Sequence, residues 1–406
     1  MHEEKPLSCE VLETPEAIAA EAAAWNAIVE EGYEGYPCLT AEWYLLWLRH
    51  FATPDTRIRF LKVSRSGKSV GYFPFLLSPE RHHGVEMCSL RLAGNVYSPI
   101  NSPVVRPGSR PEVFDFVVRE ALSKMPWTVF QTGDLPLEYA GAAELHLALQ
   151  NAGHESCLLP SEGNWIHEGG VTPAAYLKEL DAGLRNGIKR WQKRLGGMGK
   201  LELRVVGDGV TEDDIAGYQH VYDRSWKEPE IDRTFHPAMM RWASERGVLR
   251  LFLLTLDGRP IATQLWLVKR RRAYAVKFAY DEALRERSPG ALMMWRVIEH
   301  LLDVEKVETF DFLKGDDPYK KQWSNKRRQR LAILAFSPDL RGRTARWLDR
   351  ELLPWVRRQP VLSAAKRRAA ALIARRQGSA SAQNFSPEAA AGTLSGHHDE
   401  RCGSQG

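Results

Sequence analysis

The chain has 406 residues, 44% of them hydrophobic and 26% charged, which is an ordinary composition for a globular protein with room for two domains. No apolar run approaches the roughly 18–20 residues that span a bilayer, and the acidic start lacks the basic and apolar regions of a signal peptide. The five cysteines are scattered without a C-x-x-C pair, which argues against a zinc site or a disulfide framework and indicates a reducing cytosol.

The positive charge is concentrated near the C-terminus. The formal net charge at pH 7 is +5, yet residues 341–377 hold eleven Lys and Arg against only Asp349 and Glu351, a net +9 for this segment. The body that precedes it is near neutral and has no recognised nucleic-acid-binding motif. We therefore expect no nucleic-acid partner.

The first half of the chain predicts an α/β unit. A helix begins at Thr14-Pro15-Glu16, where a capping Thr, a Pro at the first helical position and an acid coincide, and it extends to Gly32. A second amphipathic helix follows over 39–51. The remaining predicted elements are a hairpin (58–77), a strand (86–94), a helix (111–125), a strand (127–135) and a helix (142–153).

The second half repeats this order of elements. The predicted elements are helices (171–199), a strand (201–206), a helix (211–226), three hairpin-linked strands (248–282), a helix from Ser288 to Leu302, a strand (307–313), a short helix or turn (317–327) and a last strand (331–337). Antiparallel strands joined through a crossover helix to a further strand predict a mixed, mostly antiparallel sheet with helices on its faces. The fold class is therefore α+β.

The helix after the third strand begins where an anion could bind. Its start, Ser288-Pro289-Gly290, follows a loop that carries Arg285 and Arg287. The first N–H groups of a helix have no internal partner and favour negative charge. Ser288, Gly290 and Ala291 would present such groups to a diphosphate, with both arginines adding charge; the alternative is an ordinary Pro-initiated helix beside a solvated basic loop.

The runs IATQLWLV, AYAVKFAYDE, SPGALMMWRVIEHL and VETFDFLKGDDPYKKQW, all within 261–323, carry a family resemblance. Their order resembles the core of GNAT acyltransferases. More narrowly, it is similar to the GNAT subfamily associated with CelD/BcsL-type proteins of polysaccharide biosynthesis, which is related to FemABX peptidyltransferases. The likeness extends over roughly residues 10–340. It implies tandem GNAT-like domains (11–160 and 161–340) after a leader (1–10). Charge and composition add a basic helical appendage (341–377) and a Ser/Gly/Ala-rich tail predicted to be disordered (378–406).

The resemblance also implies a co-substrate. In GNAT enzymes the loop after the central strand cradles the pyrophosphate of coenzyme A on backbone amides. Acetyl-CoA or another acyl-CoA would therefore bind at Arg285, Arg287, Ser288, Gly290 and Ala291, and no metal is expected.

Three residues near the last strands are the catalytic candidates. Asp311 ends a strand, where it could deprotonate or orient an amine; the alternative is a turn carboxylate. In FemX-like transferases a Lys in an aromatic-Lys pair is assigned to the active site, which implies Lys320. In many GNAT enzymes a Tyr protonates the leaving thiolate, which implies Tyr319. A solvated basic turn is the alternative for this pair.

The acceptor candidates are more widely spread along the chain. Gln264 and Lys277 lie on adjacent predicted strands and would line a cleft, or make structural hydrogen bonds. Trp226 belongs to an acidic-aromatic loop that also holds Glu228 and Glu230. Arg185 lies on a basic helix before the catalytic domain, where the family resemblance implies a contact with a substrate phosphate.

We expect a cytoplasmic N-acyltransferase, an acetyltransferase of GNAT type. It would acylate an amine, or a hydroxyl, of a sugar, polysaccharide or cell-envelope precursor. The alternatives are FemABX-like transfer from aminoacyl-tRNA to a peptidoglycan precursor and a non-enzymatic binding protein with a basic tail. Residues 341–377 would lie on an anionic membrane surface or pack on the catalytic body. The acceptor, the acyl group and the oligomeric state stay open.

Overall fold

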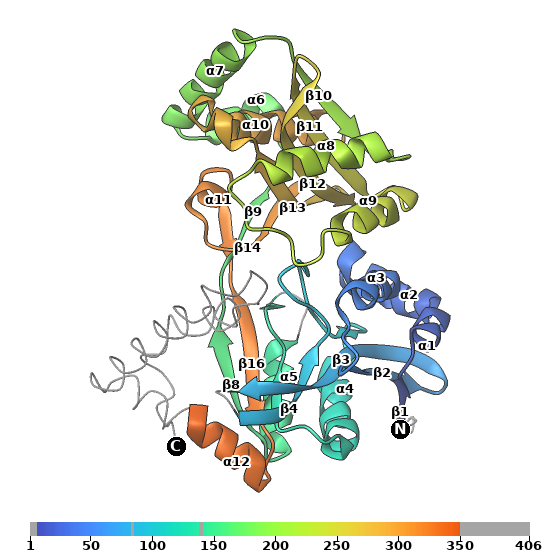
Figure 1. The fold of residues 1–406 in the computed structure, drawn as a ribbon. Coiled ribbons are helices and arrows are strands. Elements are labelled where there is room, and N and C mark those ends of the chain that lie inside the picture. Colours follow the sequence, from blue (N-terminus) through green and yellow to red (C-terminus); the bar gives the residue numbers. More distant parts are fainter. Residues whose placement is uncertain (1–5, 83–84, 138–140, 350–406) are drawn as a thin grey trace, which may run out of the picture. The chain divides into compact units, whose positions relative to one another are not determined.

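The structure, a computed structural model, describes residues 6–82, 85–137 and 141–349. The described residues up to Ala345 form one compact unit. This unit contains two mixed sheets flanked by helices, which confirms the α+β fold class (Figure 1). Of the predicted basic appendage, α12 (Leu340–Trp347) is described. The expectations for residues 350–377 and 378–406 lie outside the described residues.

The first sheet has nine strands among the described residues. Seven follow the order β1-β2-β3-β4-β6-β16-β7, with β5 paired to β3 and β8 paired to β16. The junction of β4 and β6 is parallel and the other pairs are antiparallel. The strands are β1 (Leu7–Leu12), β2 (Arg57–Arg65), β3 (Lys68–His82), β4 (Val85–Leu92), β5 (Val104–Val105), β6 (Val129–Gln131), β7 (Leu135–Pro136), β8 (Glu155–Pro160) and β16 (Arg330–Phe336).

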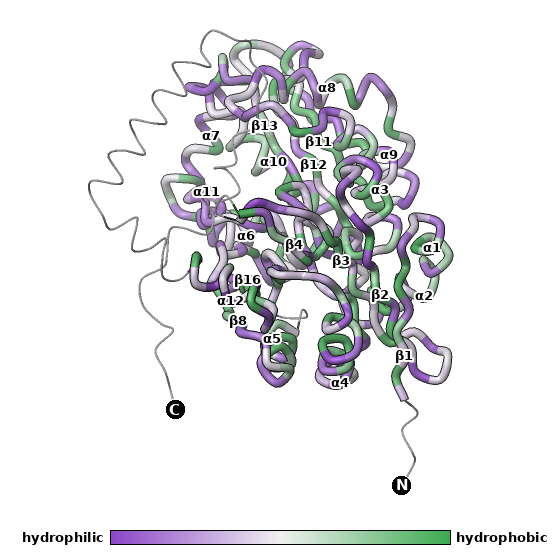
Figure 2. The backbone as a smooth tube through the Cα atoms, turned by 60° about the horizontal axis from the view of Figure 1, so that its bottom comes forward, coloured by the Kyte–Doolittle hydropathy of each residue, from purple (hydrophilic) through white to green (hydrophobic). Residues whose placement is uncertain are grey.

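Helices cover both faces of the first sheet. Phe60 and Tyr72 share one hydrophobic cluster with α1–α3, while Phe73 shares another with α4 and α5. Green and purple alternate along α4 and α5 in Figure 2, as expected of helices with one buried face. These helices are α1 (Pro15–Ala20), α2 (Ala22–Gly32), α3 (Ala41–Phe51), α4 (Arg110–Phe116) and α5 (Ala142–Asn151), with short turns η1 (Pro37–Leu39), η2 (Val117–Ala121) and η3 (Leu122–Lys124).

The predicted helix from Thr14 to Gly32 is divided in two. Thr14 caps α1 as expected, since its hydroxyl accepts a hydrogen bond from Ala17 N at 3.2 Å. The division falls at Glu21, whose carboxylate accepts from Lys62 Nζ at 2.6 Å and from the Tyr72 hydroxyl at 2.7 Å. The break therefore coincides with a link between the helix pair and the sheet.

The second sheet has seven strands among the described residues, in the order β10-β11-β12-β13-β14-β9-β15. Only the β13–β14 junction is parallel. Three antiparallel strands, a crossover helix and a parallel strand therefore occur in both sheets, which confirms the predicted repeat. The strands are β9 (Asn164–Glu168), β10 (Leu201–Val206), β11 (Leu249–Leu256), β12 (Arg259–Lys269), β13 (Arg272–Tyr280), β14 (Thr309–Lys314) and β15 (Lys326–Arg328).

Both faces of the second sheet are buried, and successive side chains along a strand point to opposite faces. Leu265 and Leu267 join the cluster that includes α8 and α9, whereas Ala262 and Trp266 join the cluster that includes α6, α7 and α10. The helices are α6 (Pro173–Glu179), α7 (Ala182–Gly196), α8 (Glu212–Asp223), α9 (Phe235–Glu245), α10 (Pro289–Asp303) and α11 (Pro318–Gln322), with the turn η4 (Glu282–Arg287).

The two sheets exchange strands. β8 lies in the first sheet and continues through residues 161–163 into β9 of the second sheet. β15 lies in the second sheet and continues into β16 of the first. The two runs lie antiparallel and connect the sheets as a ribbon (Figure 1). The sequence did not predict this exchange, and β16 pairs across the predicted boundary at 160/161, which itself stays a prediction.

Several elements lie where no element was predicted. β1 occupies part of the predicted leader and pairs with β2 along its whole length. β8, β9 and α9 were also not predicted, and β15 lies over the end of the predicted short helix or turn (317–327). Within the described part of the chain, none of the helices combines the length and the apolar character needed to cross a membrane.

Candidate functional site

β13 and β14 diverge after a short parallel pairing. The pairing joins Arg272 to Thr309 and ends where Tyr274 meets Asp311. β13 continues to Tyr280 beside β12 alone. It bulges at Val276, which lies between the partners of Leu265 and Trp266, and β14 bulges after Asp311. In the described part of the chain, no strand pairs with the second half of β13 on the side of β14, so that edge is open to side chains from loops.

The start of α10 lies directly after this edge. Ser288 has a left-handed φ of +56° and provides no side-chain cap, so the N–H groups of Gly290 and Ala291 are in an uncapped first turn. A Cβ on Gly290 would come within 2.7 Å of Tyr280 Cδ1, which makes glycine necessary for the contact between helix and strand. Arg285 and Arg287 are exposed beside this turn. These features fit a diphosphate-binding role.

The loop between β13 and α10 is held by Asp281. Its Oδ1 accepts from Ala283 N at 3.0 Å and its Oδ2 accepts from Arg224 Nε at 2.7 Å. Burial alone would raise the pKa of Asp281, but these hydrogen bonds hold it below the usual value. The carboxylate is therefore charged at neutral pH and fixes the turn η4 to the end of α8.

A buried polar cluster lies on the α8–α9 side of β13, centred on Glu230. Glu230 Oε1 is 2.5 Å from His236 Nδ1, although this approach is not aligned as a hydrogen bond, and it accepts from the Tyr218 hydroxyl at 3.3 Å. Burial lowers the pKa of His236, which keeps the imidazole neutral at pH 7. The Glu230 side chain is only 5% exposed and lines a pocket of about 190 Å³.

Lys277 extends from β13 into this cluster. Its Nζ lies 3.9 Å from Glu230 Oε1 and 5.1 Å from the ring centroids of Tyr97 and Tyr222. Burial lowers the pKa of Lys277 to about 8, with Glu230 opposing and Lys227 adding to the effect. An amine with such a pKa can exchange a proton near neutral pH.

Residues before β10 in the chain complete the cluster. The Tyr97 hydroxyl accepts from Ile231 N at 2.7 Å, and His50 Nδ1 is 2.7 Å from Asp232 Oδ2. Both contacts hold the loop that carries Glu230. The site of the second sheet is thus positioned in part by α3 and by the loop after β4.

Tyr319 and Lys320 lie on the opposite side of the open edge of β13. The Tyr319 ring is 5.3 Å from that of Phe278, and burial raises the pKa of its hydroxyl well above the usual value. Lys320 is 5% exposed, donates to the Lys314 carbonyl and lies 3.4 Å from Asp317 Oδ2. Burial lowers the pKa of Lys320 in spite of that carboxylate.

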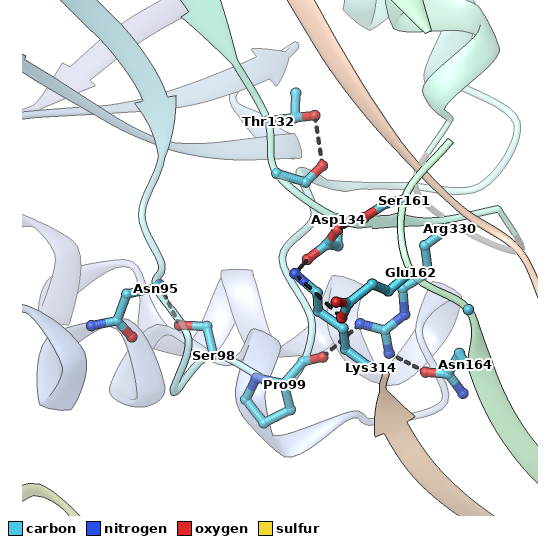
Figure 3. Close-up of polar contacts among 12 residues, drawn as sticks. Asn95, Ser98, Pro99, Thr132, Asp134, Ser161, Glu162, Asn164, Lys314 and Arg330 are labelled. Carbon is cyan, nitrogen blue, oxygen red and sulfur yellow. Dashed lines mark hydrogen bonds and ion pairs between the residues drawn. The ribbon is translucent and has the colours of Figure 1, made fainter. Parts of the chain in front are cut away.

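Asp311 belongs to the crossing of the exchanged strands. Its Oδ1 accepts from Asn164 Nδ2 at 2.9 Å and from Leu313 N at 2.7 Å. Asn164 in turn accepts from Arg330, which also donates to the Pro99 carbonyl at 3.0 Å (Figure 3). These partners favour a structural carboxylate over a proton acceptor, and the catalytic role of Asp311 stays a prediction.

Two acceptor candidates are not brought to this cluster. Gln264 is 2% exposed on the α10 face of β12, where its Oε1 accepts from Trp266 Nε1 at 2.9 Å. Lys277 pairs with Leu265 and faces the other side. Arg185 donates to the Lys178 carbonyl at 3.0 Å and thus caps α6. By contrast, Trp226 is 4.4 Å from the Tyr280 ring and does lie beside the α10 start.

The sequence did not single out Lys227, His236 or Tyr97. Lys227 Nζ lies 5.5 Å and 5.3 Å from the ring centroids of Trp226 and Phe278, and so occupies the open edge of β13. The only signal in the sequence was the density of aromatic and charged residues around Trp226. The described residues contain no group of three or more His, Cys, Asp or Glu side chains that could hold a metal ion.

Residues 182–321 match the family model described as "Acetyltransferase (GNAT) domain". This stretch begins at α7 and ends in α11, so it includes β13, α10 and β14. No curated protein sequence matches the chain. The family match and the sheet topology together support a GNAT acyltransferase fold for the second half, whereas the CelD/BcsL subfamily is not identified by them.

Three solved structures are similar across most of the chain. FemX has a TM-score of 0.54 and 11% identity, with coverage of 81% of this chain and 96% of that one. The C-terminal domain (DUF2156) of a protein described as a lysylphosphatidylglycerol synthetase from Agrobacterium fabrum has a TM-score of 0.50 and 14% identity. The match covers 82% of this chain and 95% of that one. A conserved protein of unknown function from Bacteroides thetaiotaomicron has a TM-score of 0.51 and 11% identity, and the match covers 81% of this chain and 100% of that one. At such identities the likeness concerns the fold alone.

Proposed function

We propose that the chain is a GNAT-type acyltransferase that transfers an acyl group from acyl-CoA to an amine, or less readily a hydroxyl, of a sugar, polysaccharide or cell-envelope precursor. The observation that carries this proposal is the divergence of β13 and β14 directly before the uncapped start of α10. The family match over 182–321 adds support because it contains all of these elements.

The donor would bind along the open edge of β13. The N–H groups of Gly290 and Ala291, with Arg285 and Arg287 nearby, would hold its diphosphate. The unpaired backbone of β13 would offer donors and acceptors to the donor's amide groups, as an exposed strand edge does for an extended peptide. The thioester supplies the activated acyl group, and the protein residues position it.

The residues on either side of the edge suit the two proton transfers. Glu230, to which the Tyr218 hydroxyl donates a hydrogen bond, accepts the proton of the attacking amine. The amine nitrogen bonds to the thioester carbonyl carbon and the C–S bond breaks. Tyr319 is protonated at neutral pH because burial raises its pKa, so it can give its proton to the leaving thiolate.

The test compares two carboxylates. Thioester consumption is measured with purified chain, acetyl-CoA and a panel of amino sugars and lipid-linked precursors. On an accepted substrate, Glu230→Gln should lower kcat by roughly 10²–10⁴ with coenzyme A affinity nearly unchanged, whereas Asp311→Asn should mainly lower stability. Lys320→Ala tests whether the lysine stabilises the negative charge that develops on the thioester oxygen. Tyr319→Phe tests whether the tyrosine hydroxyl is the acid that protonates the leaving thiolate. Full turnover by Glu230→Gln, Lys320→Ala and Tyr319→Phe alike would place the active site elsewhere.

A FemABX-like peptidyltransferase is the second candidate. The FemX-like fold and the buried Lys320 favour it, although neither specifies the donor. The same panel should include an aminoacyl-tRNA donor with a peptidoglycan precursor. Amide formation from that donor, with no consumption of acyl-CoA, would replace the first proposal by this one.

A further inference from the structure

Three lysines surround the open edge of β13, and burial lowers the pKa of each: Lys227, Lys277 and Lys320. Two of them have a carboxylate at ion-pair distance. Lys277 lies 3.9 Å from Glu230 and Lys320 lies 3.4 Å from Asp317. Around Lys227 Nζ no carboxylate lies at that distance in the part of the chain that the structure describes. Its close neighbours are the rings of Trp226 and Phe278.

Lys227 also lines the pocket of about 190 Å³ that contains Glu230. The other charged groups of this pocket are already engaged. Arg233 Nη2 lies 2.5 Å from Asp223 Oδ2, and Glu230 Oε1 lies 3.9 Å from Lys277 Nζ. Burial lowers the pKa of Lys227 and the charges of Asp317 and Glu230 oppose this effect, but neither carboxylate lies at ion-pair distance from its ammonium.

Withdrawing an ammonium from water is unfavourable unless an anion faces it. Contacts with two aromatic rings recover part of this loss but do not neutralise the charge. We propose that Lys227 binds an anionic group, a carboxylate or a phosphate, carried by the acceptor molecule. The assignment to the acceptor rests on the proposed acyl transfer, whereas the binding of an anion in the pocket does not.

The pocket is separate from the place expected for the donor's diphosphate. Its lining comes from α8 and from the loop that follows it, and includes no residue of η4 or α10. The uncapped N–H groups of Gly290 and Ala291 belong to α10. An anion bound at Lys227 would thus lie beside the attacking amine, in reach of Glu230. The site would therefore favour anionic amino sugars or phosphorylated precursors over neutral acceptors.

The binding experiment uses the full chain and the probes inorganic phosphate and acetate, at constant ionic strength with chloride. Lys227→Met removes the charge with little change of volume. Lys227→Arg keeps the charge, and Lys200→Met, at a lysine side chain that is 74% exposed, is the matched control. We expect at least one probe to raise the melting temperature of the parent chain. Lys227→Met should weaken binding at least tenfold, whereas Lys227→Arg and Lys200→Met should retain it.

Without any probe, the Lys227→Met variant should melt at no lower a temperature than the parent, since the substitution removes a partly buried ammonium that has no carboxylate at ion-pair distance. Failure of both probes to bind the parent, or equal binding by Lys227→Met, would overturn the anion site. A matching loss of coenzyme A affinity in Lys227→Met would overturn the assignment to the acceptor, because the anion would then be the donor's. If anion binding depends on Lys227 but no acyl transfer is detected, the site stands and the proposed function fails.

Discussion

Lys277 illustrates a residue whose charge state is set by its surroundings rather than by its type. Its amine is surrounded by Tyr97, Tyr222 and one carboxylate, that of Glu230. Its pKa, lowered to about 8, lies below the ordinary value of 10.5. Between these two values the unfolded chain binds more protons than the folded chain. Stability contributed by this residue should therefore rise as the pH increases from 8 to 10.5.

We expect Lys277→Met to raise the free energy of unfolding at pH 7 by on the order of 1–3 kcal/mol, because the buried ammonium no longer loses its hydration. The gain should shrink as the pH rises from 8 to 10.5, because the folded lysine is then mostly neutral and the unfolded lysine begins to lose its proton. Urea unfolding at pH 7, 9 and 10.5 measures this trend. Lys200→Met serves as a control. A variant that is destabilised equally at every pH would show that the pKa of Lys277 is not lowered.

At the scale of elements, the contact between β13 and the start of α10 depends on the absence of a side chain at Gly290. A methyl group there would lie 2.7 Å from Tyr280 Cδ1, and overpacking of this kind costs about 1–3 kcal/mol. Gly290→Ala should lower both the melting temperature and the affinity for acyl-CoA. The loss should be smaller when Tyr280→Ala is present, because the ring that clashes is gone.

Gly196→Ala provides the comparison, since a Cβ there meets nothing within 4 Å. The four chains of the cycle, the parent, each single variant and the double variant, are compared by thermal unfolding and by isothermal titration with acetyl-CoA. An equal effect of Gly290→Ala with and without the Tyr280 ring would mean that steric contact is not the reason for glycine at this position.

Elements with strong local signals could be predicted from the sequence. α3, the hairpin strands β11–β13 and α10 combine caps, turns and apolar periodicity within a few residues. β8, β9 and β15 are short, and their partners lie far along the chain, so no local pattern specifies them. β16 was predicted as a strand, but membership in the first sheet depends on pairing with β6 and β8 over more than a hundred residues.

In the candidate site, too, only residues with a local sequence signal could be predicted. The start of α10 and Trp226 were recognisable because helix-start chemistry and aromatic density are local signals. Lys227 and His236 were not, because their burial depends on Phe278 and on residues that meet only in the folded chain. Gln264 and Lys277 were predicted to share a cleft, yet the bulge and alternation on β12 and β13 direct them to opposite faces.

At the scale of the whole molecule, we expect that neither half of the chain folds independently, because the two sheets exchange strands. Residues 11–160 lack β16, which pairs with β6, β7 and β8, and residues 161–340 would carry β16 without its sheet. Expressed alone, each fragment should unfold without a cooperative transition or aggregate. Residues 1–349, which keep every described strand, should unfold cooperatively. Thermal unfolding followed by circular dichroism tests this. A sharp transition in the isolated 11–160 fragment would contradict it.

The exchange also sets an order in time for a chain that is still being made. Domains generally fold as units, the N-terminal one first, while synthesis adds about 5–20 residues per second. In this protein β8 is synthesised with no strand partner among the described residues until β16 follows. That interval is roughly 10–35 s at the same rate of synthesis. Throughout it the nascent first half presents an incomplete sheet with an open edge, which is a site for unwanted strand pairing. The protein should therefore depend on chaperones that shield exposed strand edges during translation more than a protein with two self-contained domains does.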